Sequence, residues 1–204
     1  MSRSKGAFAS SRLRIGEACV WEQRARHCPI CAAALGKKQV EERERLWCPD
    51  CGLILYLNPA AAAAAVVLRG REVLLIRRCS APYRDHWTLP AGYEEYDEPP
   101  MLTAVRETKE ETGLDVRVTG LLDVLYTEDD PRKRGILVVY LCEVVGGEIR
   151  AGDDAAEARF FPIDALPAEI GFRNNRRILE RVRTELGTGG VRTLPISPDA
   201  GSGA

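Results

Sequence analysis

The chain has 204 residues, which is enough for one ordinary domain and a small satellite but not for two full-sized domains. Hydrophobic residues make up 45% and charged residues 29%, and the formal net charge is −1, so composition is globular and gives no electrostatic case for nucleic acid as the main partner. The longest apolar run, residues 60–68, is far shorter than the roughly 20 residues of a membrane-spanning helix, so no membrane partner is expected.

Composition shifts along the chain predict four parts. Residues 1–26 form a polar, disordered lead, 27–57 a compact cysteine-bearing unit, 58–186 the main domain, and 187–204 a disordered tail rich in glycine, serine and proline. Seven cysteines, an odd number, favour free thiols and a reducing, cytoplasmic compartment. Because the lead is basic and contains serines, an organellar targeting segment is the alternative.

Two Cys-x-x-Cys pairs dominate the small unit. Cys28 and Cys31 are separated by 16 residues from Cys48 and Cys51. Four thiolates at this spacing predict a closed, tetrahedral, structural Zn²⁺ site, which needs no further ligand from the adjoining His27. The metal would supply folding free energy that so short a unit cannot obtain from an apolar core.

The main domain is predicted to contain strands and helices in alternation. Residues 60–68 are ambiguous, because their alanines favour helix and their Val-Val-Leu favours strand. An Arg-Gly-Arg turn followed by residues 73–76 indicates a hairpin, and hence strand. Residues 135–145 predict another strand, and residues 98–112 and 174–186 predict helices. This order of elements indicates an α/β or α+β sandwich.

The helix at 98–112 carries the chemistry that can be predicted from residue types. Two prolines suit its first turn and Gly113 suits its end. At about 100° per residue, Glu107, Glu110 and Glu111 share one face. Like charges at this spacing repel, and a divalent cation would reverse that penalty; oxygen ligands favour Mg²⁺ or Mn²⁺ over zinc. The alternative is an ordinary solvated acidic face. The opposite face is expected to pack through Met101, Val105, Thr108 and Thr112.

A longer pattern around this helix resembles a known family. The string Gly92-x5-Glu98-x7-Arg106-Glu107-x2-Glu110-Glu111-x-Gly113-Leu114 is similar to the Nudix box at its charged and glycine positions. The one departure is Thr108, where the family usually has an aliphatic residue. The resemblance implies an α+β fold, a Nudix α/β/α sandwich with a mixed sheet, preceded here by the small zinc ribbon. It also implies a pyrophosphatase that hydrolyses a nucleoside diphosphate linked to another group, releasing a nucleoside monophosphate.

The resemblance further implies roles for individual residues. The catalytic Mg²⁺ or Mn²⁺ ions would be held by Glu107, Glu110 and Glu111, with the backbone carbonyl of Ala91 contributing. Arg106 would orient a carboxylate through a charge-assisted hydrogen bond. Glu98 would tie the preceding loop to the helix.

The general base is left open between the helix and a later loop. Residues 152–161 resemble the family's E-x-x-E-A-R-W-F stretch, with Asp154 and Glu157 in the acid positions and Phe160 in place of tryptophan. Either of these two acids, or Glu107, is a candidate for the base. The alternative for the loop is ordinary surface charge.

Substrate contacts are predicted from residue chemistry alone. Arg77 and Arg78 are candidates for binding phosphate, and Tyr83, Trp87 or Tyr126 for stacking on a base. Structural roles are the alternatives, since Trp87 precedes a core-like Leu-Pro and arginines are common at exposed strand ends.

A zinc ribbon before a Nudix domain is similar to two groups of enzymes. NADH pyrophosphatases carry Ser-Gln-Pro-Trp after the box, and residues 114–135 contain no such motif. Residues 28–172 look more like ADP-ribose or FAD pyrophosphatases with a short N-terminal ribbon. Cleavage of oxidised nucleoside triphosphates or RNA caps is an enzymatic alternative. Binding of nucleic acid or protein through the ribbon and the arginine-rich helix is a non-enzymatic one. The resemblance also implies a homodimer, although no spacing indicates it.

Overall fold

The computed structural model describes residues 25–130, 133–152 and 154–196. Contacts along the chain separate two compact units between Leu57 and Asn58, and each unit is described by itself. The expectation of a disordered or targeting lead concerns mainly residues 1–24, which lie outside the described residues. In the described part of the chain, no helix is long and apolar enough to cross a membrane.

The small unit is a cysteine-bearing hairpin. Strands β1 (Gly36–Val40) and β2 (Arg43–Trp47) pair antiparallel, and an isolated bridge joins Trp47 to Ile54. The Lys38 ammonium lies over the Trp47 ring at 4.8 Å, and the Arg45 guanidinium lies over Tyr56 at 4.5 Å. These contacts cover the hairpin but create no apolar core, because only Cys28 and Cys48 are buried apolar side chains among the unit's described residues.

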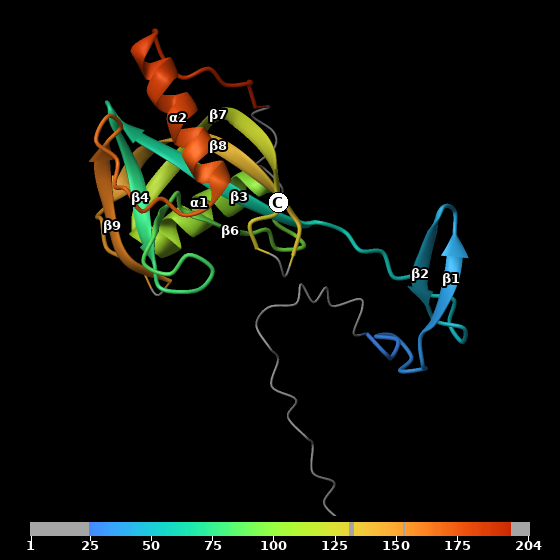
Figure 1. Cartoon of the computed structure of the whole chain (residues 1–204). Helices are drawn as coiled ribbons and strands as arrows, with labels where there is room; N and C mark the ends of the chain where they lie inside the picture. The colour runs from blue at the N-terminus through green and yellow to red at the C-terminus, as the bar shows by residue number, and fades with distance from the viewer. Residues whose placement is uncertain (1–24, 131–132, 153, 197–204) are drawn as a thin grey trace, which may run out of the picture. The chain divides into compact units, whose positions relative to one another are not determined.

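The larger unit is built on one mixed sheet with the order β5-β4-β3-β8-β7, to which β6 is added beside β3 and β9 beside β4 (Figure 1). Strand β3 runs parallel to β8 and antiparallel to β4 and β6, and the remaining pairs are antiparallel. The strands are β3 (Ala60–Arg69), β4 (Glu72–Arg78), β5 (Trp87–Thr88), β6 (Ala91–Tyr93), β7 (Leu114–Thr127), β8 (Gly135–Gly147) and β9 (Ala155–Pro162).

Two helices cover opposite faces of this sheet (Figure 1). Helix α1 (Pro100–Thr112) packs Ala104 against the face that carries Leu74, and helix α2 (Arg173–Gly187) packs Ile178 against the face that carries Leu75. The expected α+β sandwich with a mixed sheet is therefore confirmed.

The alanine-rich segment is a strand, as the hairpin argument predicts. Strand β3 lies in the middle of the sheet, and Ala63, Ala64 and Ala65 have no exposed surface. These small side chains let α1 pack close to the backbone of β3. Packing against neighbouring strands on both sides thus outweighs the high helix propensity of alanine.

Four strands of the sheet, β5, β6, β7 and β9, were not among the expected elements. Strand β7 alternates buried and exposed residues from Leu114 to Val116, a period of two that is typical of a half-buried strand. Strand β9 pairs with β4 along its length, from Glu72↔Pro162 to Arg78↔Ala155. The sequence signal for β7 was therefore present, whereas β9 depends on a partner about 80 residues earlier in the chain.

The expected disordered tail is wrong for its described part. Leu194 forms a bridge with Leu121, with N–H···O distances of 3.0 and 2.8 Å in the two directions. The backbone N–H of Arg192 donates to the Glu185 carboxylate at 2.8 Å, and the Arg192 guanidinium donates to the same group at 3.1 Å. Backbone pairing with an edge strand orders a segment whose composition alone favours disorder. Residues 197–204 lie outside the described residues.

Candidate active site

Helix α1 ends where the sequence predicts and begins two residues later, at Pro100 instead of residue 98. Pro100 occupies the first turn, and Gly113 adopts a left-handed conformation with φ of 75° while its N–H donates to the Lys109 carbonyl at 2.9 Å. Thr108, the departure from the family pattern, is fully buried, and its hydroxyl donates to the Ala104 carbonyl at 2.7 Å. The hydroxyl is satisfied within the helix, so a threonine is accommodated on the packing face.

The three box glutamates occupy different environments. The Glu110 side chain is 58% exposed, that of Glu107 is 16% exposed, and Glu111 is buried. An Oε atom of Glu111 accepts a hydrogen bond of 3.0 Å from the backbone N–H of Ala91. The helix therefore presents a carboxylate in solvent, one at the boundary and one inside the protein, rather than a uniformly solvated acidic face.

Arg106 lies at the centre of a network of carboxylates. Its Nη1 donates to Glu107 at 2.7 Å and to Glu110 at 3.1 Å, while Nε and Nη2 donate to Glu98. Nη2 also donates to the Tyr93 carbonyl at 3.1 Å, which joins the network to β6. Glu98 accepts the Thr103 hydroxyl at 2.8 Å, so it links the loop before α1 to the helix.

Burial and charge shift the acidities of this network. Burial raises the pKa of Glu111 to about 8, with Glu107 and Asp154 adding to the effect and the Ala91 N–H and Arg78 opposing it. Burial also raises the pKa of Glu107, although the Arg106 hydrogen bond opposes it. The hydrogen bond from Arg106 lowers the pKa of Glu98 despite the cost of burial. Arg106 thus stabilises the charged forms of Glu98 and Glu107. Among the described residues, Glu111 has no such partner and keeps the largest free-energy cost of ionisation.

This donor set fits a hard divalent cation. The candidate ligands are carboxylate oxygens and the Ala91 carbonyl, with Glu111 buried and penalised for ionising, a penalty that a cation would relieve. A Cβ atom at position 92 would overlap the carboxyl group of Glu107, so glycine there leaves space at the site. The three carboxylates do not converge on one point, because Arg106 bridges Glu107 and Glu110.

The later loop contributes its two acids to different places. Asp154 lies close enough to Glu111 for its charge to raise the Glu111 pKa. Glu157 faces Arg77 across the β4–β9 pair and lies 3.7 Å from its Nε and 3.7 Å from that of Arg159. Alternation along β4 puts Arg77 on the face of Leu75, whereas α1 packs on the face of Leu74. The structure therefore brings Asp154 to the box and places Glu157 on the opposite face.

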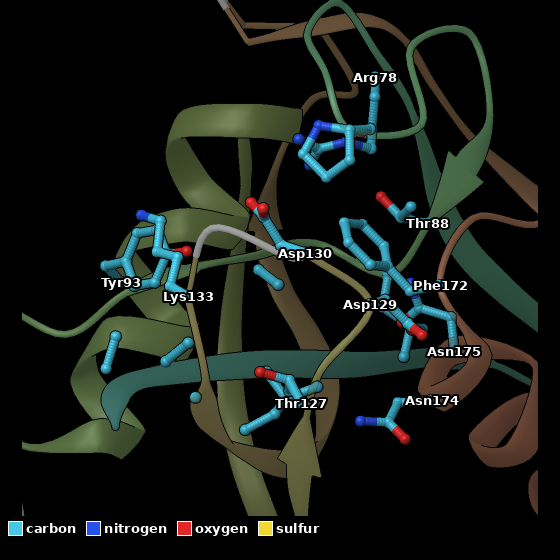
Figure 2. Close-up of a pocket in the computed structure, with 18 of the residues that line it drawn as sticks. Arg78, Thr88, Tyr93, Thr127, Asp129, Asp130, Lys133, Phe172, Asn174 and Asn175 are labelled. Carbon is cyan, nitrogen blue, oxygen red and sulfur yellow. The ribbon is translucent and has the colours of Figure 1, made fainter. Parts of the chain in front are cut away.

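A pocket of about 360 Å³ adjoins the box (Figure 2). Ala91 and Gly92 border it from the side of α1, and Arg78 lines it at the end of β4. Among the polar and aromatic side chains of its wall are Thr88, Tyr93, Thr127, Asp129, Lys133, Phe172, Asn174 and Asn175. Its volume falls in the range of small-ligand sites, and its polarity suits a ligand with both charged and planar parts.

Only some of the residues expected to contact the substrate line this pocket. Arg78 lines it and donates through Nε to the Pro82 carbonyl at 3.0 Å. Arg77 and Tyr83 do not line it; Arg77 faces Glu157, and the Tyr83 ring packs against Phe172 at 4.6 Å. Trp87 is buried against Phe161 in the core.

Several pocket residues escaped the sequence interpretation. Phe172, Asn174 and Asn175 lie around the start of α2, and Thr127 and Asp129 lie at the end of β7. They meet only in the tertiary structure. No local motif distinguishes them, although an aromatic residue before a helix was available as a weak signal.

The four cysteines converge in the small unit. Their Sγ atoms all lie within 4.8 Å of one another, with Cys28 to Cys51 at 3.6 Å and Cys31 to Cys48 at 3.4 Å. Ligands about 2.3 Å from a tetrahedral Zn²⁺ would stand about 3.8 Å apart, which is close to these separations. Among the described residues, this is the one group of three or more Cys, His, Asp or Glu side chains that converges so tightly.

Family models match both units of the chain. The NUDIX domain model matches residues 58–182, and the Nudix N-terminal model, that of the zinc ribbon, matches residues 26–57. An ADP-ribose pyrophosphatase of Methanocaldococcus jannaschii is 40% identical over 134 residues, which cover 65% of this chain and 79% of that protein. An NAD-capped RNA hydrolase NudC of Pseudomonas aeruginosa is 33% identical, and the match covers 72% of this chain but 51% of the relative.

Solved structures give the same result. A NUDIX hydrolase from Nitrosomonas europaea superimposes with a TM-score of 0.75 at 28% identity, covering 83% of this chain and 96% of the other. The box helix, the mixed sheet and the matched models lead to one conclusion: the chain belongs to the Nudix hydrolase family and carries its N-terminal zinc ribbon.

Proposed function

We propose that this chain hydrolyses the diphosphate bond of ADP-ribose, FAD or a related dinucleotide and releases a nucleoside monophosphate. One observation carries the proposal: the buried Glu111 is hydrogen-bonded to Ala91, and Ala91 also lines the ligand-sized pocket. A diphosphate reaching from that pocket to the box would lie beside carboxylates able to hold a cation. The similarity to the M. jannaschii ADP-ribose pyrophosphatase supports this substrate class.

The catalytic cation of the proposal is Mg²⁺ or Mn²⁺. Glu107, Glu110, Glu111 and the Ala91 carbonyl would hold it, and when bound it would screen phosphate charge and lower the pKa of the attacking water. Arg106 positions Glu107 and Glu110 through its hydrogen bonds.

The chain's own residues divide the remaining work. Arg78 lines the pocket and its charge acts on Glu111, so it is positioned to bind a phosphate oxygen. Asp154 is the better placed of the two loop acids to accept a proton from water, because its charge acts on the box. Glu107 is the other candidate, whereas Glu157 is paired with arginines on the other face of the sheet.

The metal of the small unit is proposed to be a structural Zn²⁺ held by the four cysteines. Their sulfur–sulfur separations of 3.4 and 3.6 Å support a tetrahedral site. Metal analysis of the purified protein is expected to give one zinc per chain.

A second candidate activity is removal of NAD caps from RNA or cleavage of NADH, which the similarity to NudC favours. The non-enzymatic alternative, nucleic-acid binding through the arginine-rich α2, is weakened by the contacts of its arginines. Arg173 pairs with Asp129 and Glu128, and Arg181 pairs with Glu185. Neutralised side chains attract a polyanion poorly.

We also infer that two copies associate as a homodimer through β7. The support is a group of exposed apolar side chains there, Val124 and Tyr126 on β7 and Leu194 beside it. Sedimentation equilibrium tests this inference, and a monomer at micromolar concentration would contradict it.

A substrate panel tests the function. Purified protein with Mg²⁺ is incubated with ADP-ribose, FAD, NADH, NAD-capped RNA and an oxidised nucleoside triphosphate. We expect AMP from ADP-ribose or FAD at the highest kcat/KM, and a loss of at least about 100-fold in Glu107→Gln, because the charge that holds the cation is removed. Preference for capped RNA would favour the second candidate, and binding without turnover would contradict both.

A further inference from the structure

Phe172, which directly precedes α2, has an unusual backbone. Its φ is 56° and its ψ is 135°. A bulky side chain with positive φ is uncommon and costs free energy, so it persists only where the surroundings impose it. Such outliers gather at functional sites, and this one lines the pocket beside the box.

The start of α2 is held by another loop and leaves the Phe172 side chain available. The Asp129 carboxylate accepts hydrogen bonds from the Arg173 backbone N–H at 2.8 Å and from its Nε at 2.7 Å. The Asn174 amide donates to the Tyr126 carbonyl at 3.0 Å. The residue before a helix usually caps it with its own side chain. Here Asp129 does so from the loop after β7, and an aromatic residue takes the capping position.

The Phe172 ring packs against Tyr83 and Arg78, and Phe172 lines the cavity. Its centroid lies 4.6 Å from that of Tyr83, and the Arg78 guanidinium lies 5.3 Å from it. Figure 2 shows the ring within the cavity, below Arg78 and above Asn174. Because the backing groups fix its orientation, a planar ligand can stack on it with little loss of side-chain freedom.

We propose that Phe172 is the stacking platform for the nucleobase of the substrate, with the diphosphate passing Arg78 toward Glu111. This rests on the proposed function, since it assigns the base end of the same substrate. Arg78 connects the two ends, because it touches the Phe172 ring and its charge acts on Glu111. Aromatic stacking tolerates any base, so Phe172 contributes affinity for nucleosides in general.

The test compares AMP with ribose 5-phosphate, which lacks the base. In Phe172→Leu, which keeps an apolar side chain but no aromatic face, AMP affinity measured by calorimetry in Mg²⁺ is expected to fall roughly 10-fold or more. Affinity for ribose 5-phosphate is expected to stay within about twofold, because the sugar phosphate does not touch the ring. Phe172→Tyr is expected to retain AMP binding, because it keeps an aromatic face. Tyr96→Leu is the matched control, since this tyrosine is fully exposed and lies outside the pocket lining.

Turnover and fluorescence supply independent readouts. With ADP-ribose, Phe172→Leu is expected to raise KM and leave kcat nearly unchanged. In Phe172→Trp, AMP but not ribose 5-phosphate is expected to quench the new indole fluorescence, which tests stacking even if the leucine variant does not fold. Unchanged AMP affinity in a folded Phe172→Leu, or equal losses for both ligands, would overturn the proposal. Failure of the proposed function would instead appear as wild-type protein that does not cleave dinucleotides, while the AMP comparison still reports on stacking.

Discussion

The buried Glu111 makes a prediction about the protein without magnesium. Glu111→Gln keeps the shape of the side chain and an oxygen that can accept the Ala91 N–H, and it removes the charge. In the wild-type protein, burial raises the Glu111 pKa from 4.5 to about 8. The folded state therefore binds more protons than the unfolded state between those values, and the free energy of unfolding falls as pH rises through this window.

The size of the effect follows from the two pKa values. At pH 7 the gap from 4.5 is 2.5 pH units, which corresponds to about 3 kcal/mol at about 1.4 kcal/mol per unit. Glu111→Gln is expected to recover most of this, raising Tm by roughly 6–12 °C in magnesium-free buffer for a chain of this size. Below pH 4.5 both proteins carry a neutral group, and the difference should vanish.

Thermal unfolding followed by circular dichroism from pH 4.5 to 8.5 measures this difference. Chelators are omitted, so that the metal of the cysteine unit is the same in both proteins. Glu110→Gln is the matched control: its side chain is 58% exposed, so its Tm should stay close to that of wild type. Added Mg²⁺ should stabilise the wild type more than Glu111→Gln. If the two proteins show parallel Tm curves across this pH range, the buried-carboxylate argument is wrong.

Three further predictions concern the site and the cysteine unit. Gly92→Ala should lower kcat/KM by at least about 100-fold with little change in Tm, because the new methyl overlaps the Glu107 carboxyl and displaces a proposed ligand. Normal rates in steady-state kinetics would contradict the close approach of Gly92 to Glu107. Arg106→Lys should cost roughly tenfold or more in kcat, since one ammonium cannot serve three carboxylates at once, and the Mg²⁺ concentration for half-maximal rate should change with it. Cys48→Ser should abolish zinc retention and increase proteolysis within residues 26–57, while the Nudix unit's melting transition remains; unaltered zinc content by atomic absorption would show that Cys48 is not a ligand.

Helix α1 and the cysteine unit could be predicted from the sequence because their information is local. Proline at the start of α1 and Gly113 at its end define the helix, and four cysteines in two short pairs define the ribbon. The spacing of Glu107, Glu110 and Glu111 placed them on one helix without reference to the rest of the chain. Even the alanine strand β3 was assigned correctly from a neighbouring turn.

The depth of each group and the identity of its partners were decided by the tertiary structure. Glu111 is buried where β6 packs against α1. Glu157 is separated from the box because it pairs with Arg77 across β4 and β9, two neighbouring strands that are far apart in the sequence. Tyr126 was a candidate for stacking but is exposed outside the pocket, whereas Phe172 lines it. Periodicity gives the side of an element on which a residue lies, but burial and charge depend on what packs against that side. For this chain, local sequence therefore determined the chemistry, and long-range packing determined where in the protein that chemistry operates.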